Sequence, residues 1–288
     1  MKISVSARHA LAVFIAALVL AAVRTYIVVN MLELTVYEVN EYYLPDGLIT
    51  RLFAVTAVIC CLAFALLSLL TMRKKTAETA ERSSLVVFFT VIAALVVLGT
   101  VINSFTVAIS DTAKLFSNIG VGQTLKLLVK DYGLIVLICG LACSICMFIM
   151  ARHMRKDPPN RNALAGHNLA LIIFSGVRLL FAFIVHRSTP SVSSGAYNIL
   201  ALAATLLFFV CDGKAFIKKG SAALYTCFGY IAVILTLVYS VPDLWIHLFG
   251  PLSFDVEASG ALVSIIFALL IVTKLAALPE ELDELTKE

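Results

Sequence analysis

Residues 85–110 read LVVFFTVIAALVVLGTVINSFTVAIS, a continuous apolar run that contains no Asp, Glu, Lys or Arg. An α-helix needs about 20 mostly apolar residues to cross a bilayer, so this run is long enough to span one. Strands of outer-membrane barrels instead alternate in hydrophobicity over about 10 residues, and this run does not alternate. The stretch therefore predicts a transmembrane α-helix.

Runs of the same kind fill most of the chain. It has 288 residues, of which 61% are hydrophobic and 14% are charged, whereas soluble domains carry about 25% charged residues. The stretches between the runs are too short for a separate soluble domain. The sequence thus predicts an all-α integral membrane protein, a bundle of eight transmembrane helices. The other runs lie approximately at 9–29, 48–72, 131–151, 164–186, 195–217, 221–244 and 256–278.

Lys and Arg are concentrated in every second gap between the runs. One such gap begins with Arg73, Lys74 and Lys75, whereas residues 30–47 and 245–255 contain neither residue type. Cytoplasmic loops carry the excess of Lys and Arg in membrane proteins, so we expect both termini to be cytoplasmic in a multi-pass protein of the cell membrane. The net charge of +4 reflects this sidedness, and we expect no nucleic-acid partner.

The two halves of the chain resemble each other. The first run contains His9 followed later by Arg24, and the fifth contains His167 followed later by Arg178. Between the halves lie two adjacent prolines among charged residues, and proline interrupts helices. If the similarity is more than chance, the halves are parallel four-helix repeats related by an axis along the membrane normal. The predicted halves are 1–157 and 158–288.

Cysteine placement bears on disulfides and metals. All seven cysteines lie inside predicted spans, so we expect no disulfide framework. Cys139, Cys143 and Cys146 share one helical face, a spacing that would suit a soft metal such as Cu(I). Their neighbours Gly140 and Ser144 instead favour a close-packed helix face. We therefore expect no metal and no cofactor.

Arg24 and Arg178 place positive charge inside predicted spans. An arginine at mid-bilayer costs about 2.5–3.5 kcal/mol on insertion scales, so Arg178, near the middle of its run, is expected to face the bundle and pair with an acid. Asp243 lies near the same predicted depth and is the partner we expect. Arg24 lies in the outer half of its run, and for both arginines the alternative is snorkelling to the headgroups.

Further polar residues map to the same outer half and predict a ligand site around the two arginines. Asp243 follows Pro242, where a helix break would free carbonyl groups. A basic pocket open to the outside would bind an anionic headgroup or a small carboxylate. The alternative is an interfacial belt of aromatic residues with one structural Arg–Asp pair. The remaining members of this predicted site are Asn103, Tyr197, Asn198, Tyr239 and Glu257.

A second polar pair is predicted at the inner ends of two successive runs. His167 lies at the start of the fifth run, and Asp212 lies near the end of the sixth. Because consecutive helices usually touch, we expect these two side chains to meet. The pair would relay protons or serve as a structural hydrogen bond.

Three functions remain open. A carrier or flippase for a small anionic solute or lipid would use the interface between the halves and the outer basic pocket. A non-catalytic component would bind membrane lipids or a partner protein, with the acidic tail after Pro279 as a docking segment. A lipid-modifying enzyme would need a carboxylate at headgroup depth, from Asp131, Asp243 or Glu257, and the sequence lacks the common hydrolase motifs. A carrier is favoured, because intramembrane charge and two-fold repeats occur together in carriers.

Overall fold

The computed structural model has a helix at each apolar run. Among the residues that it describes, eight helices are long and apolar enough to cross a membrane. This confirms the all-α bundle of eight transmembrane helices. The described residues are 5–31, 33–34, 42–43, 47–72, 83–116, 134–156, 160–186, 192–249 and 256–278. The acidic tail after Pro279 and Asp131, both assigned roles above, lie outside them.

The helices begin and end close to the predicted bounds, although α3 continues well past the predicted residue 110. The elements are α1 (Val5–Met31), β1 (Glu33–Leu34), β2 (Tyr42–Tyr43), α2 (Leu48–Thr71), α3 (Ser84–Phe116), α5 (Leu134–Met154), α6 (Arg161–His186), α7 (Val192–Phe216), α8 (Ala222–Phe249) and α9 (Val256–Ala276).

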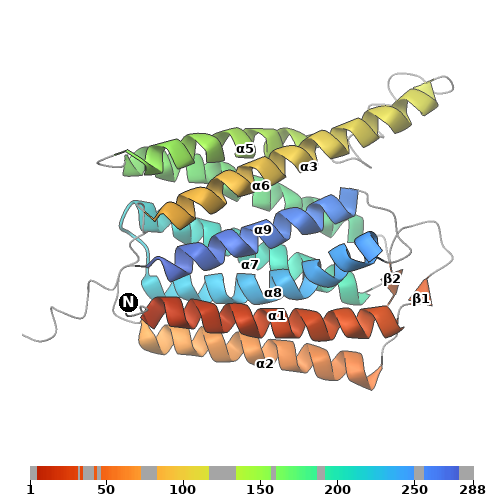
Figure 1. Cartoon of the computed structure of the whole chain (residues 1–288), viewed down its shortest axis with the longest axis horizontal. Coiled ribbons are helices and arrows are strands. Elements are labelled where there is room, and N and C mark those ends of the chain that lie inside the picture. The colour runs from red at the N-terminus through yellow and green to blue at the C-terminus, as the bar shows by residue number, and fades with distance from the viewer. Residues whose placement is uncertain are drawn as a thin grey trace, which may run out of the picture.

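The two ends of the bundle are distinct in Figure 1. At one end α1 begins and α9 ends, and we call it the terminal end. At the other, α1 ends and β1 pairs with β2 in antiparallel register, with Glu33 opposite Tyr43. We call this the hairpin end. The half of the bundle nearer the hairpin end is the hairpin half, and the half nearer the terminal end is the terminal half.

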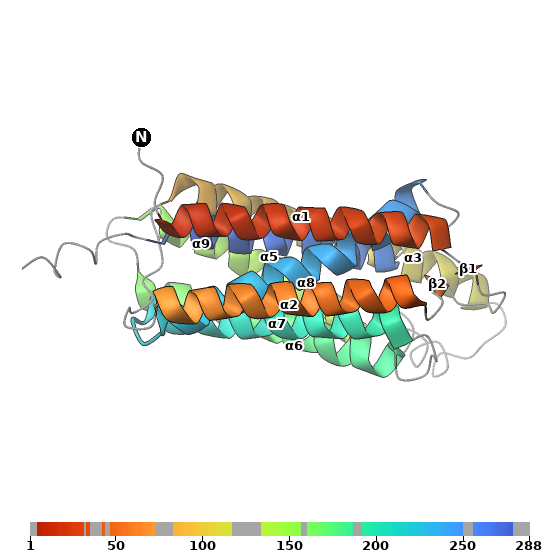
Figure 2. The same ribbon diagram turned by 90° about the horizontal axis from the view of Figure 1, so that it is seen from below.

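Helix α8 is the core of the bundle. It packs against α1, α2, α7 and α9, and 72% of its span is buried, compared with 17% of the span of α2. Figure 2 shows α8 between α1 and α2. Helix α9 is enclosed in the same way by α1, α3 and α8. Polar side chains on α8 and α9 therefore lie inside the protein and away from lipid.

The two halves of the chain pack differently. Helices α6, α7 and α8 each pack on the next helix in sequence. Helices α1 and α2 share few contacts and pack on α8 instead, whereas α3 and α5 pack together and reach the core through α9 and α6. In Figure 1 these two pairs lie on opposite sides of the second half. The two-fold repeat, with its boundary between 157 and 158, stays a prediction.

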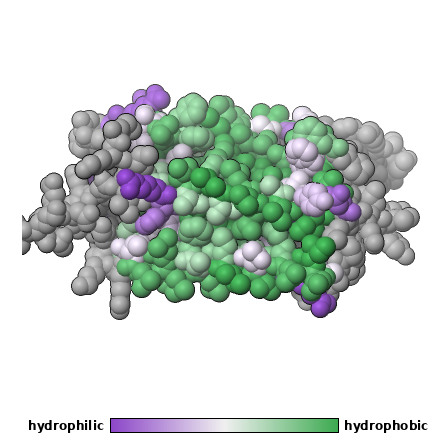
Figure 3. All heavy atoms as spheres, turned by 60° about the horizontal axis from the view of Figure 1, so that its bottom comes forward, coloured by the Kyte–Doolittle hydropathy of each residue, from purple (hydrophilic) through white to green (hydrophobic). Residues whose placement is uncertain are grey.

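The lateral surface of the bundle is apolar. Figure 3 shows a broad hydrophobic band between hydrophilic side chains toward the two ends. On α2, large side chains such as Leu52, Ile59 and Leu70 are exposed, Leu70 by 79%. Soluble proteins rarely expose continuous apolar patches larger than a few hundred Å². The surface is that of a multi-pass membrane protein whose helices contact lipid.

Small residues bring α5 close to its neighbours. A Cβ atom at Gly140 would lie 2.7 Å from Cγ2 of Val101 on α3 and 3.2 Å from Cε2 of Phe174 on α6. Ser144 donates a hydrogen bond to the carbonyl of Ala94, at 2.8 Å, and Cys143 between them is fully buried. This face of α5 is therefore used for helix packing, as expected for small residues between membrane helices.

Candidate functional site

Arg24 is buried in the hairpin half and is held by a backbone carbonyl. Its exposure is 2%, and its Nη1 donates to the carbonyl oxygen of Val238 on α8, at 3.1 Å. That carbonyl is free to accept because its helical donor would be residue 242, which is a proline without an N–H. Helix α8 nevertheless continues through Pro242 to Phe249, so the helix break considered above does not occur.

An aromatic ring completes the surroundings of Arg24. Its guanidinium carbon lies 4.1 Å from the centroid of the Tyr197 ring on α7, a cation–π distance. Its Nη2 is buried and has no hydrogen-bond partner among the described residues. Arg24 thus lies inside the protein, which excludes snorkelling. Among the described residues, its Nη2 has no acceptor.

Arg178 on α6 is also held by backbone and hydroxyl oxygens. Its Nη2 donates to the carbonyl of Gly260, at 2.9 Å, and to Oγ of Ser264, at 3.0 Å, both on α9. The ring of Phe174 lies 5.7 Å from its guanidinium carbon, and Tyr239 of α8 is within electrostatic range. Arg178 thus joins α6 to α9, and none of its bonded partners among the described residues is a carboxylate.

The predicted Arg178–Asp243 pair is wrong. Asp243 is 5% exposed and lies in the hairpin half of α8, as expected, but it is not among the partners of Arg178. Similar depth in the membrane was the basis of the prediction. Depth does not give the rotation of each helix, and the side chain of Arg178 meets α9.

Other predicted site residues lie in the same half. Asn103 of α3 donates to Oγ of Ser259 on α9, at 3.1 Å, so it joins α3 to the core helix α9. Asn198 and Tyr239 are half-buried on α7 and α8. Glu257 lies in the first turn of α9, and its side chain is outside the described set. We call the buried polar groups around Arg24 and Arg178 the hairpin-side layer.

Helix α8 contributes a polar stripe to this layer, of which sequence reasoning identified only Asp243. Thr236, Ser240, Asp243 and His247 are all buried and follow one another at spacings of four and three, which places them on one helical face. The hydroxyl oxygens of Thr236 and Thr205 of α7 lie 3.3 Å apart. This spacing is the signal that could have identified Ser240 and His247.

The terminal half contains a buried ion pair. Lys274 on α9 donates from Nζ to Oδ2 of Asp212 on α7, and Oη of Tyr225 on α8 donates to Oδ1 of Asp212, at 3.3 Å. Asp212 is fully buried and Lys274 is 5% exposed. Nζ of Lys274 also lies 5.4 Å from the centroid of the Phe216 ring. We call Asp212, Lys274 and Tyr225 the terminal-side cluster.

The predicted His167–Asp212 pair is also wrong, although α6 and α7 do pack together. The ring of His167 stacks on His153 of α5, with centroids 5.5 Å apart. The next residue, Asn168, is the one that faces α7, and its Nδ2 donates to the carbonyl of Phe209 at 2.8 Å. Successive helical residues point about 100° apart, so His167 faces α5 instead.

A row of aromatic rings joins the two polar regions. The centroid distances are 6.3 Å for Phe174–Phe267, 5.3 Å for Phe267–Phe209, 5.7 Å for Phe209–Phe208 and 4.9 Å for Phe208–Tyr225. All five rings are buried, and they come from α6, α9, α7 and α8. The row begins beside Arg178 and ends at the tyrosine that bonds Asp212. We call it the aromatic row.

Comparisons with known protein families, with curated proteins and with solved structures found no match. The hairpin-side layer and the terminal-side cluster are the two candidate functional regions among the described residues. Lys274 is the main residue of these that was missed. The sequence feature that could have predicted the ion pair is an acid and a cation, Asp212 and Lys274, that lie in different runs at similar distances from the terminal end.

Proposed function

We propose that the chain is a carrier or flippase for a molecule with an anionic group, either a small anionic solute or an anionic lipid. The observation that carries the proposal is the way in which Arg24 and Arg178 are held. Both guanidinium groups bond to backbone carbonyl or hydroxyl oxygens and lie near aromatic rings, and neither bonds to a carboxylate among the described residues.

Uncompensated charge in the hairpin-side layer favours an anion. Burying a charge in an apolar environment is costly unless it is paired, and carbonyl dipoles compensate a cation only in part. A guanidinium presents its N–H groups in a fork that matches carboxylate and phosphate oxygens. Nη2 of Arg24, which lacks a partner among the described residues, provides such a donor. An anion between the core helices would satisfy it.

Transport explains more of the polar residues than passive binding does. A component that only binds a headgroup needs polar residues at one depth. Here buried polar groups occur in both halves of the core, at Arg178 and at Asp212, and the same four helices supply the aromatic row between them. Intramembrane ionisable residues commonly mark substrate or ion pathways, and here they occur at two depths of α6–α9.

A lipid-modifying enzyme is less well supported. Its catalytic carboxylate would have to reach the headgroup region. Asp243, the described candidate, is 5% exposed and points into the bundle from α8. The carboxylate is better placed to tune the charge of the hairpin-side layer than to act on a headgroup.

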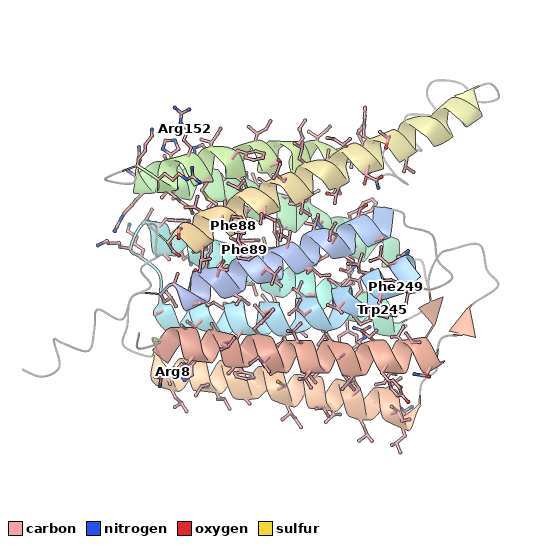
Figure 4. The ribbon with its side chains drawn as sticks, in the orientation of Figure 1. Arg8, Phe88, Phe89, Arg152, Trp245 and Phe249 are labelled. Carbon is pink, nitrogen blue, oxygen red and sulfur yellow. The ribbon has the colours of Figure 1, made fainter. Side chains whose placement is uncertain are left out.

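We place the terminal end in the cytoplasm and the hairpin end outside the cell membrane. Figure 4 places Arg8 and Arg152 near the terminal end and the Trp245–Phe249 pair toward the hairpin end. The rings of that pair are 4.5 Å apart at their centroids. Cationic residues on the cytoplasmic side and aromatic residues at the interface are typical of membrane proteins. The anion site would then lie in the outer half.

The proposal is tested in vesicles containing the purified protein. Fluorescent NBD-phosphatidylglycerol on the inner leaflet is protected from dithionite in inert vesicles and becomes accessible when a protein moves it. NBD-phosphatidylcholine is the neutral control. We expect movement of the anionic lipid that is lost in Arg178→Gln and kept in Arg152→Gln, whose side chain is exposed at the terminal end.

A second arm separates lipid from solute. Melting of the detergent-solubilised protein is followed with inorganic phosphate or acetate as the probe. A shift that Arg24→Gln abolishes, without lipid movement, would assign a small anion as substrate. Absence of lipid movement together with absence of any melting shift would refute the anion carrier.

A further inference from the structure

The terminal-side cluster ties three core helices together at one end. Asp212 belongs to α7, Lys274 to α9 and Tyr225 to α8, and both carboxylate oxygens of Asp212 are engaged. Arg178 joins α6 to α9 in the other half. A carrier must separate its core helices at one end at a time, so the cluster lies where the terminal end would open.

Opening that end while both charges remain is unfavourable. Separating a carboxylate from an ammonium inside the bilayer leaves two unpaired charges in a medium of low dielectric constant. Ionisable residues at such positions commonly mark ion pathways and proton relays. A proton on Asp212 removes one of the two charges, and with it most of the attraction that holds Lys274.

Lys274 is placed to leave once it is released. It lies in the last turn of α9, which ends at Ala276. A lysine so close to a helix end can extend its side chain to the membrane surface, and the negative end of the helix dipole favours it there. Asp212, by contrast, is fully buried, and its short side chain stays within the bundle.

Groups from three helices surround the Asp212 carboxylate. Lys274 faces it from α9 and Tyr225 from α8, and Cys211 adjoins it on α7 with Lys214 near by. From α6, Asn168 is neutral and bonds Phe209, while His167 stacks on His153. Among the described residues, the carboxylate therefore has a single bonded cation.

We infer that Asp212 is a proton-binding site that couples the carrier to protons, and that its ion pair with Lys274 keeps the terminal end closed. A proton from the aqueous phase adds to a carboxylate oxygen of Asp212, forming one O–H bond. The ion pair breaks, Lys274 keeps its own proton, and the end opens. Loss of the Asp212 proton restores the pair. This inference rests on the proposed carrier function.

Proton binding is tested first, with the proton as the probe. Infrared difference spectra of the purified protein between acidic and alkaline buffer should contain the C=O band of a protonated carboxyl. The band should disappear in Asp212→Asn and move in Asp212→Glu, which keeps an acid if the first variant folds poorly. A carboxyl band unchanged in both variants would overturn the inference whether or not the protein transports anything.

Coupling is tested next, in the NBD-phosphatidylglycerol vesicles. With equal pH on both sides, wild-type movement should accelerate severalfold in acidic buffer. In Asp212→Asn, which resembles the protonated state, the rate should no longer depend on pH. Tyr230→Phe, buried on α8 but outside the cluster, is the control and should keep the pH dependence.

The outcomes separate the two proposals. No movement by the wild type, with the infrared band present, refutes the lipid carrier and leaves Asp212 as a proton site. Movement by the wild type that Asp212→Asn leaves equally dependent on pH refutes the coupling and leaves the carrier. A purely structural ion pair would change stability in Asp212→Asn but would not remove the pH dependence.

Discussion

The hairpin-side layer and the terminal-side cluster both bury cations among the same helices, but they compensate the charge in different ways. Lys274 is neutralised by a carboxylate, Asp212, and a phenol completes the group. Arg24 and Arg178 are held by carbonyl and hydroxyl oxygens and aromatic rings. The comparison teaches that Lys274 is bonded to a carboxylate, whereas Arg24 and Arg178 have none among their bonded partners in the described part of the chain.

The largest effect is expected from breaking the terminal-side cluster. Lys274→Met leaves Asp212 buried with only Tyr225, and removal of one partner of a buried pair costs about 3–5 kcal/mol of unfolding free energy. The double variant Asp212→Leu with Lys274→Met should recover most of that loss, because no lone charge remains. Denaturation of the detergent-solubilised protein measures both. A double variant less stable than Lys274→Met would show that the loss does not come from an unpaired Asp212 carboxylate.

The next largest effect concerns Arg24 and the proline of α8. Arg24→Met leaves the Val238 carbonyl without a donor, because Pro242 supplies none, and a buried unsatisfied carbonyl costs about 1–3 kcal/mol. In a Pro242→Ala background the new N–H can bond that carbonyl, so Arg24→Met should cost less. The same denaturation assay on the four proteins gives the coupling. Equal costs in both backgrounds would contradict our account of why Arg24 is held.

A smaller effect is expected for Tyr225→Phe, which removes a single donor from Asp212. The ion pair remains, so the loss should be about 0.5–1.5 kcal/mol, the usual range for one hydrogen bond. Tyr230→Phe, also buried on α8 but outside the cluster, serves as the matched control. If the control loses as much stability as Tyr225→Phe, the phenol does not contribute through Asp212.

The smallest effect on stability is expected for Arg178→Gln. The Gly260 carbonyl also accepts from Oγ of Ser264, so loss of Arg178 leaves it satisfied, and the change should stay below about 1 kcal/mol. Added phosphatidylglycerol should raise the melting temperature of the wild type and of Arg178→Lys, but not of Arg178→Gln. A destabilised Arg178→Gln that still responds to the lipid would make Arg178 structural and remove it from the anion site.

Hydropathy alone predicted the eight helices and most of their bounds, because spanning a bilayer requires long apolar runs. It also identified Arg24 and Arg178, since a cation in such a run must be buried or must snorkel. The partners of these residues were not predictable in the same way. The acceptor of Arg24 is on α8, far away in sequence, and hydropathy does not show which distant helices become neighbours.

The two wrong pairs share one cause. Asp243 was assigned to Arg178 by depth, and His167 to Asp212 by adjacency of their helices. Neither argument fixes the rotation of a helix about its axis, and a rotation of one residue is enough to bring Asn168 rather than His167 to α7. Lys274 was missed for a different reason. It lies in the last turn of its span, where a lysine usually snorkels to the membrane surface, so the sequence did not mark it as buried.

The proline in α8 has a consequence for how the protein is made. Helix α1 leaves the ribosome before α8, the helix whose carbonyl receives Arg24, and five other described spans lie between them in the chain. During synthesis Arg24 therefore enters the bilayer before its acceptor exists, close enough to the end of α1 to be solvated by headgroups. Its transfer to the Val238 carbonyl has to wait until α8 is inserted, which makes the docking of α1 a late step of assembly.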